Sequence, residues 1–101
     1  MPRRLRHTER ARKDLIDIWN YYDEVGAPAA GEKLLRKIAR TLETLSALPE
    51  SAPLRRELRP DMRSFHVDRY ILYFDYTESD LRLIRVVHGA RDITPDLFDD
   101  V

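Results

Sequence analysis

Residues 62–92 constrain the fold most, because three runs of β-forming residues are packed into about thirty positions. Apolar and polar residues alternate over residues 64–67, which is typical of a half-buried strand. Residues 70–76 and 81–87 are apolar or aromatic on both faces at most positions, which is typical of strands in the middle of a sheet. Short polar breaks separate the runs, as tight turns do. The second half of the chain is therefore predicted to form sheet hairpins over about residues 62–88.

The predicted sheet also carries basic, histidine and tyrosine side chains. These are Arg63, His66, Arg69, His88 and Arg91, with Tyr70, Tyr73 and Tyr76 among them. Arginine makes bidentate contacts to phosphate and carboxylate groups, and histidine changes its charge near neutral pH. A sheet with these side chains could therefore handle phosphates or dock an acidic partner.

The first half of the chain is predicted to form a short strand and then two antiparallel helices. Residues 4–7 are the strand candidate, and Thr8 followed by an acidic residue is a typical helix start. Apolar residues at helical spacing then form one stripe per helix. The first stripe is Ala11, Leu15, Ile18, Trp19 and Tyr22, and the second, between about residues 28 and 47, is Leu34, Leu35, Ile38, Leu42 and Leu45. Gly26 and Pro28 predict the turn of a helical hairpin over about residues 8–48, with both aromatic residues of the first stripe in the core.

Length and composition limit the class of protein. The chain has 101 residues, no cysteine and a formal net charge of zero. We expect one domain, residues 1–101, and no apolar run approaches the roughly 18 residues of a membrane helix. The absence of cysteine and of an N-terminal apolar segment favours a cytoplasmic protein. Zero net charge counts against a general nucleic-acid coat protein, and we expect no direct sequence-specific DNA binding from this chain alone. The histidines His7, His66 and His88 lack metal-ligand spacing, so we expect no metal and no cofactor.

Charge is distributed unevenly along the chain. Residues 1–13 carry six Lys or Arg against one Glu, whereas residues 92–101 carry four Asp and no basic residue. Pro95 with these acids predicts a short, loosely held acidic tail. Residues 49–61 are predicted to be a connecting loop with three arginines, which are Arg55, Arg56 and Arg59. Such a run is either a solvated loop or a contact for an acidic or phosphate surface.

Four local motifs follow one another in the chain. They are Ala11-x-x-Asp14-Leu15-x-x-Ile18-Trp19-x-Tyr21-Tyr22, Leu45-x-x-Leu48-Pro49, Met62-Arg63-Ser64-Phe65-x-Val67-x-Arg69-Tyr70-Ile71-x-Tyr73 and Ile84-Arg85-Val86-Val87-His88-Gly89-Ala90-Arg91-Asp92. With the order β-α-α-β-β-β, these motifs resemble the ParE/RelE superfamily of bacterial toxins, and ParE-type members in particular. The resemblance covers roughly residues 3–98. It implies an α+β fold in which a helical hairpin packs on one face of a curved antiparallel sheet, to which the first strand is added.

The resemblance also implies a function. ParE-type proteins are toxins of type II toxin–antitoxin systems, are neutralised by a cognate antitoxin encoded nearby, and are associated with inhibition of DNA gyrase. RelE-type relatives are ribosome-dependent mRNA endoribonucleases, which would make this chain a metal-independent nuclease. A third alternative is a non-toxic chain that acts as an antitoxin-bound co-repressor. RelE-type nucleases typically place a Tyr and basic residues after the last strand, and residues 92–98 contain neither here. This departure favours a gyrase inhibitor that acts by binding rather than as an enzyme.

Two sets of candidate residues follow from the resemblance. The candidates for toxic activity are Arg63, Arg69, His88 and Arg91, together with the tail segment 92–98. In the nuclease alternative, the arginines would stabilise the phosphorane and His66 or His88 would act as base or acid. The candidates for binding an acidic antitoxin helix are Arg55, Arg56, Arg59 and Tyr73.

Overall fold

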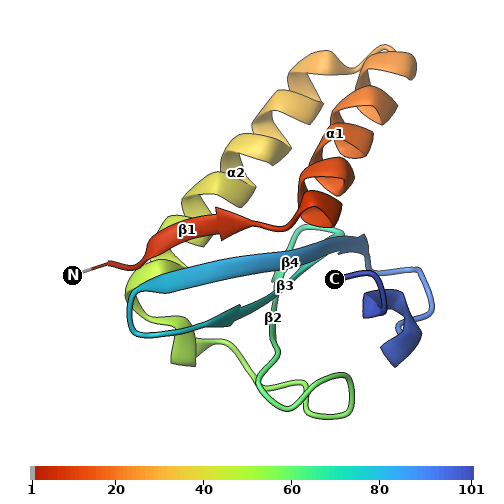
Figure 1. The fold of residues 1–101 in the computed structure, drawn as a ribbon. Helices are drawn as coiled ribbons and strands as arrows, with labels where there is room; N and C mark the ends of the chain where they lie inside the picture. The colour runs from red at the N-terminus through yellow and green to blue at the C-terminus, as the bar shows by residue number, and fades with distance from the viewer. Residues whose placement is uncertain (1) are drawn as a thin grey trace.

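The computed structural model describes residues 2–101, which form two helices and a sheet with short 3-10 helices after α2 and near the C-terminus (Figure 1). The elements are β1 (Arg4–His7), α1 (Glu9–Glu24), α2 (Pro28–Ala47), η1 (Pro49–Ser51), β2 (Arg63–Val67), β3 (Tyr70–Tyr76), β4 (Asp80–His88) and η2 (Pro95–Phe98). The predicted β-α-α-β-β-β order and the α+β class are confirmed.

The four-stranded sheet has the order β1-β4-β3-β2. Strands β2, β3 and β4 pair antiparallel through tight turns, as the sequence predicts. Strand β1 instead runs parallel to β4, so the sheet is mixed rather than wholly antiparallel. The helical hairpin separates β1 from the other strands, and no short turn forces the antiparallel direction on it. Strands β3 and β4 therefore occupy the centre of the sheet, with β1 and β2 at its edges.

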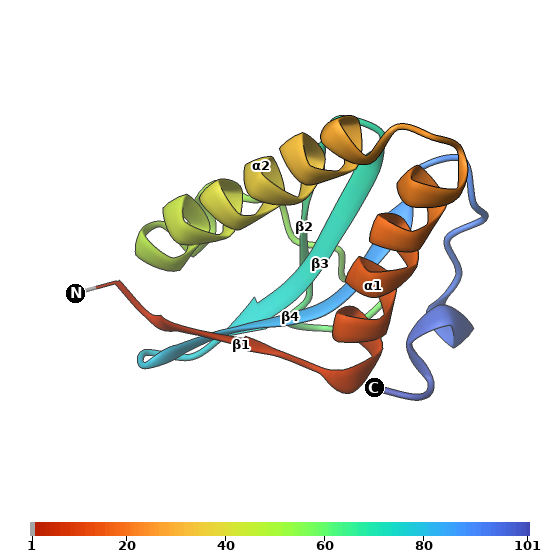
Figure 2. The same ribbon diagram turned by 90° about the horizontal axis from the view of Figure 1, so that it is seen from above.

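Both helices cover one face of the sheet, as the view from above shows (Figure 2). The side chain of Thr8 caps α1 by accepting a hydrogen bond from the Ala11 amide at 3.0 Å. Gly26, at φ 75°, turns the chain between the helices, and Pro28 starts α2. Gly31 lets the two helices approach closely, because a Cβ at this position would stand 2.6 Å from the Cβ of Tyr22.

The other face of the sheet is covered by the loop after η1 and by the C-terminal tail. Phe98 from η2 is fully buried there, with 0% of its surface exposed. The apolar cluster on this face consists of Leu58, Met62, Ile71, Tyr73, Ile84, Val87 and Phe98. The predicted loosely held tail is therefore wrong, because Ile93, Leu97, Phe98 and Val101 pack against the sheet while the aspartates of the segment face solvent.

Two side-chain predictions also differ from the structure. Trp19 is 42% exposed on α1, although the helical stripe placed it in the core. The stripe spans a wider arc of the helix than the sheet and α2 cover, so its outer edge stays in solvent. Phe65 is 37% exposed because β2 is an edge strand, whereas Ser64 is 2% exposed beneath the preceding loop. Arg55 donates a hydrogen bond to the Ser64 hydroxyl at 3.3 Å, which makes the burial of this polar side chain tolerable.

Candidate functional site

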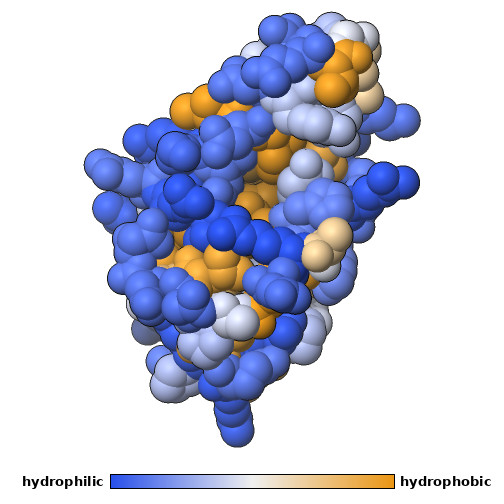
Figure 3. Space-filling view, turned by 90° about the vertical axis from the view of Figure 1, so that its right-hand side faces the viewer, coloured by the Kyte–Doolittle hydropathy of each residue, from blue (hydrophilic) through white to orange (hydrophobic). Residues whose placement is uncertain are grey.

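A cleft of about 480 Å³ lies between α1 and the adjoining ends of β3 and β4. Its lining residues are Arg10, Asp14, Asp17, Ile18, Tyr21 and Tyr22 from α1, Arg69 from the turn before β3, Tyr70 from β3 itself, and Arg85, Val86, Val87, His88 and Arg91 from β4 and the segment after it. The space-filling view toward α1 and the tail shows apolar surface recessed between hydrophilic rims (Figure 3). We call this hollow the α1–β4 cleft.

The cleft brings together three of the four residues predicted to carry the activity, namely Arg69, His88 and Arg91. Arg63 is not among them, because it begins β2 and pairs with Phe74 at the opposite end of the sheet. Its guanidinium donates a hydrogen bond to the Ala52 carbonyl at 2.6 Å and lies 5.7 Å from the centre of the Tyr76 ring. The geometry therefore gives Arg63 a role in holding the loop after η1.

The His88 side chain is fixed by two neighbours. Its Nδ1 atom accepts a hydrogen bond from the Ala90 amide at 3.1 Å, and its ring packs edge-to-face on Tyr70 with centroids 5.2 Å apart. A neutral imidazole that accepts at Nδ1 carries its proton on Nε2. His88 thus presents a hydrogen-bond donor in this arrangement, whereas a general base must present a free lone pair. His66, the other histidine considered for catalysis, is exposed on β2 and does not line the cleft.

Arg69 and Arg91 are the available cations of the cleft. Both side chains are exposed, and neither has a carboxylate within 4.0 Å among residues 2–101. Arg69 lies with Asp68 in the tight turn between β2 and β3, and Arg91 lies just after the end of β4, so both side chains are carried by short segments next to strands. With the exposed Tyr21 ring nearby, they suit a carboxylate or phosphate on a larger partner.

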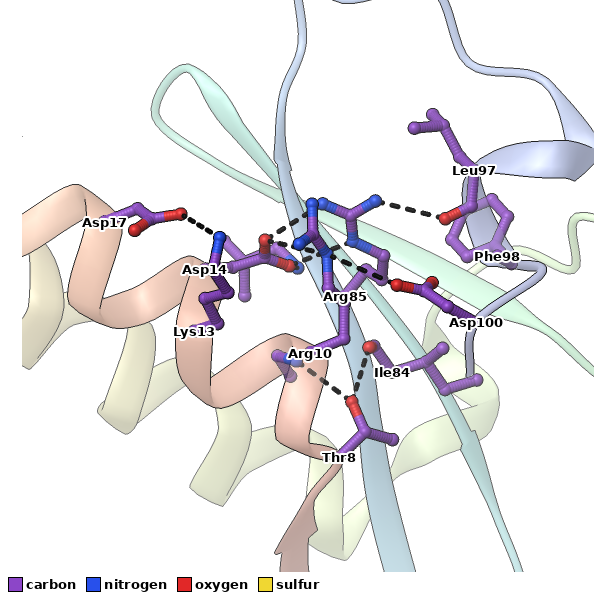
Figure 4. Close-up of polar contacts among 12 residues, drawn as sticks. Thr8, Arg10, Lys13, Asp14, Asp17, Ile84, Arg85, Leu97, Phe98 and Asp100 are labelled. Carbon is purple, nitrogen blue, oxygen red and sulfur yellow. Dashed lines mark hydrogen bonds and ion pairs between the residues drawn. The ribbon is translucent and has the colours of Figure 1, made fainter.

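A buried ion pair forms one wall of the cleft (Figure 4). The Arg85 guanidinium donates to both carboxylate oxygens of Asp14, at 3.1 and 2.9 Å, and the side chains are 4% and 6% exposed. Asp14 Oδ2 also accepts a hydrogen bond from the Val86 amide at 3.0 Å. The third nitrogen of the guanidinium, Nη1, donates to the Leu97 carbonyl at 3.1 Å. The pair therefore connects α1, β4 and the tail.

The position of this pair follows from the short first strand. The pairing of β1 with β4 ends at His7 and Leu83, so the next backbone groups on that edge of β4 have no strand partner. The Thr8 hydroxyl donates to the Ile84 carbonyl at 2.7 Å, and Asp14 accepts from the amide two residues later. Side chains of α1 thus replace a strand at this edge. The sequence analysis missed Asp14, although Arg85, between apolar residues of a central strand, indicates a buried acidic partner.

The residues predicted to bind an acidic helix are not one exposed patch. Arg56 is exposed, whereas Arg55 is half-buried and pairs with Glu57 at 2.9 Å. Arg59 donates hydrogen bonds to the Phe98 and Val101 carbonyls of the tail. Tyr73 is 0% exposed and packs edge-to-face on Phe98, with ring centroids 5.0 Å apart. Tyr73 can therefore meet a partner only if the tail moves, and the role of these four residues stays a prediction.

Two classes of site were also considered within residues 2–101. No group of three or more His, Cys, Asp or Glu side chains is arranged there to hold a metal ion. No helix in the same residues is long and apolar enough to cross a membrane.

The fold is shared with a solved toxin–antitoxin structure. The chain is similar to a chain of the chromosomal ParDE TA system from P. aeruginosa, with a TM-score of 0.72 and 18% sequence identity, over 85% of this chain and 95% of that one. No curated protein matches the chain in sequence. Residues 5–93 match the family described as the ParE toxin of the type II toxin-antitoxin system parDE. Because this match spans most of the sequence, the chain belongs to the ParE toxin family.

Proposed function

We propose that this chain is the toxin of a type II toxin–antitoxin pair, that a cognate antitoxin neutralises it, and that it inhibits DNA gyrase by binding. The family match over residues 5–93 is the observation that carries this proposal. The α1–β4 cleft is its proposed contact with the target, because Arg69 and Arg91 project there without acidic partners among the described residues. An acidic protein surface or a DNA phosphate would complement both guanidiniums.

The chemistry of the cleft supports binding rather than RNA cleavage. Cleavage by attack of the 2′-hydroxyl requires a base to take up the proton. His88 is the one histidine that lines the cleft, and its Nδ1 is already engaged by the Ala90 amide. The acidic segment after β4 would also repel an RNA backbone. The nuclease alternative keeps one supporting observation, which is that Arg69, His88 and Arg91 converge on the same cleft.

The test is induction of the chain alone in a bacterial host, with the DNA damage response and mRNA integrity followed in the same culture. Gyrase inhibition predicts damage signalling and arrested replication while transcripts remain intact. Codon-phased mRNA cuts without early DNA damage would replace the proposal by the nuclease. Normal growth with folded protein present would favour the antitoxin-bound co-repressor.

A supercoiling assay with purified gyrase then tests the cleft. The double variant Arg69→Ala with Arg91→Ala should lose at least tenfold in inhibitory potency, because two charge-assisted contacts are removed. Arg40→Ala is the matched control, since Arg40 is an exposed arginine on α2 that does not line the cleft. If the double variant and the control inhibit gyrase equally well, the cleft is not the contact with the target, although gyrase remains the proposed target.

A further inference from the structure

The tail is held on the sheet through its backbone. Arg85 donates to the Leu97 carbonyl at 3.1 Å, and Arg59 donates to the carbonyls of Phe98 and Val101. Hydrogen bonds to backbone carbonyls do not depend on which side chains the segment carries. The two arginines would therefore accept another peptide in the same place. We call the surface beneath residues 93–101 the tail groove.

One aromatic side chain anchors the tail in this groove. Phe98 is fully buried, and its ring packs edge-to-face on Tyr73 at an interplanar angle of 70°. Ile93, Leu97 and Val101 are only partly buried against the same apolar cluster, and Asp96, Asp99 and Asp100 are exposed. A peptide with one fully buried aromatic anchor, partly buried apolar neighbours and carbonyl contacts is bound as peptide segments are bound in protein grooves, so another peptide could replace it.

The tail fills the groove imperfectly. The Tyr73 ring lies beneath Phe98, and its buried hydroxyl makes no hydrogen bond of normal geometry within residues 2–101, although the Arg55 guanidinium lies near it. Burial raises the pKa of Tyr73, although the nearby Arg55 guanidinium opposes this, so the hydroxyl is neutral and can donate a hydrogen bond. A buried polar group without a partner is unfavourable. An occupant with an oxygen acceptor at this position would satisfy the hydroxyl that the tail leaves unpaired.

The charges indicate which kind of peptide fits. The tail carries four aspartates, and its Asp100 carboxylate lies 3.9 Å from the Arg10 side chain. Arg59 also approaches the tail and has no carboxylate within 4.0 Å among residues 2–101, whereas the charge of Arg85 is balanced by Asp14 and residues 92–101 contain no basic side chain. The groove thus complements an acidic segment with an aromatic anchor.

We propose that the tail groove is a docking site for an acidic, aromatic-anchored segment of the neutralising partner, and that the chain's own tail competes for it. The identity of the partner as the antitoxin rests on the proposed function, whereas the groove rests on the contacts above. The tail is attached to the domain, so its effective concentration is high, on the order of millimolar for short links. A partner segment must therefore outcompete Phe98, and reaching the Tyr73 hydroxyl would help it to do so.

The experiment uses a fluorescent synthetic peptide with the sequence of residues 92–101 as the probe. Phe98→Ala removes the internal anchor, and this variant should bind the probe at least tenfold more tightly than the unaltered chain. Circular dichroism checks that the variant is folded. Phe98→Leu keeps an apolar side chain in the groove, and its affinity for the probe should lie between those of the alanine variant and the unaltered chain. The comparison can therefore still be made if the alanine variant unfolds. A probe with alanine in place of its phenylalanine should bind at least tenfold more weakly.

A matched pair of arginines tests the groove itself. On the Phe98→Ala background, Arg59→Gln should weaken probe binding at least fivefold, because its carbonyl contacts are lost. Arg56→Gln should leave binding unchanged, since Arg56 is exposed and makes no hydrogen bond or ion pair in the described part of the chain. Equal effects of the two substitutions would indicate general charge attraction and would overturn the groove.

The remaining outcomes identify the occupant. Purified antitoxin should displace the bound probe from the Phe98→Ala variant, and failure to displace it would overturn the assignment to the partner. Light scattering tests whether the groove instead binds the tail of a second copy of this chain. Such an exchange of tails would give dimers that the probe dissociates, and this result would also overturn the proposal. Probe binding does not depend on toxicity. A chain that binds the probe but leaves gyrase active would refute the proposed function and leave the groove intact.

Discussion

Asp14→Ala is a substitution for which the structure predicts a large loss of stability. It removes three hydrogen bonds, two from the Arg85 guanidinium and one from the Val86 amide. It also leaves the Arg85 side chain, 4% exposed, without its counter-charge. Removing one partner of a buried ion pair costs about 3–5 kcal/mol. A domain of this size is stable by roughly 5–15 kcal/mol, so the variant should lose about a fifth or more of its free energy of unfolding.

Asp17→Ala is the matched control, because it changes the same residue type on the same helix. Asp17 is 58% exposed and lies 3.7 Å from Lys13, which is itself 63% exposed. Exposed pairs of this kind contribute about 0–1 kcal/mol. Both substitutions gain the same helix propensity from alanine, so this contribution cancels in the comparison. The difference in free energy of unfolding between the two variants therefore isolates the contribution of the buried ion pair.

Urea unfolding followed by the fluorescence of Trp19 and by circular dichroism measures both variants. We expect the unfolding midpoint of Asp14→Ala to fall far below that of Asp17→Ala at similar slope. Adding Arg85→Met to Asp14→Ala should recover part of the loss, because no charge is then buried alone. If Asp14→Ala and Asp17→Ala differ by less than about 1 kcal/mol in their free energy of unfolding, the reasoning is refuted, because the buried pair would then contribute no more than an exposed pair.

Three further predictions concern local packing, capping and pH. Gly31→Ala should lower the free energy of unfolding by about 1–2 kcal/mol, because the new Cβ would stand 2.6 Å from the Cβ of Tyr22 and the strain exceeds the gain in helix propensity. The midpoint of urea unfolding measures this loss. Thr8→Ala should lower the free energy of unfolding, measured by thermal denaturation, by about 1–2 kcal/mol, because it removes the hydrogen bond from the Ala11 amide and the hydrogen bond to the Ile84 carbonyl. Thr8→Ser keeps the hydroxyl and should retain most of this stability. Burial, with a smaller contribution from Arg12, lowers the pKa of His7 below its ordinary value of 6.5. The unfolded chain therefore takes up this proton first, so stability is full above about pH 6.5 and declines as the pH falls below it; His7→Gln should flatten that part of a stability–pH curve.

The element order could be predicted because each element has its own hydrophobic period. The helical stripe of α2 and the apolar runs of β3 and β4 fix the type of each element without any tertiary information. Thr8 and Pro28 mark helix starts through local backbone chemistry. In the structure, α1 begins directly after Thr8, and α2 begins at Pro28. These signals act over one or two turns of chain. They carry no information on the direction of β1, which depends on a partner more than seventy residues away.

The arrangement of the candidate site was predicted less well, because the residues that contact one another there are distant in sequence. Asp14 lies 71 positions from Arg85, and nothing near it on α1 indicates that it is buried. Arg63 and Arg69 are six positions apart in the chain, yet the hairpin register carries them to opposite ends of the sheet. The contacts of Arg59 with the tail leave no signature at all, since backbone carbonyls are present in every sequence.

The Arg85 guanidinium joins the two surfaces proposed here. Asp14 holds two of its nitrogens, which fixes the plane of the group and aims Nη1 at the Leu97 carbonyl. A peptide that replaces the tail must offer a carbonyl in the same place, or this nitrogen loses its partner in a buried site. The groove therefore selects for backbone position through Arg85 and for an aromatic side chain through Tyr73. Asp14 controls the first of these without touching the peptide, so its loss should loosen the tail even where the domain remains folded.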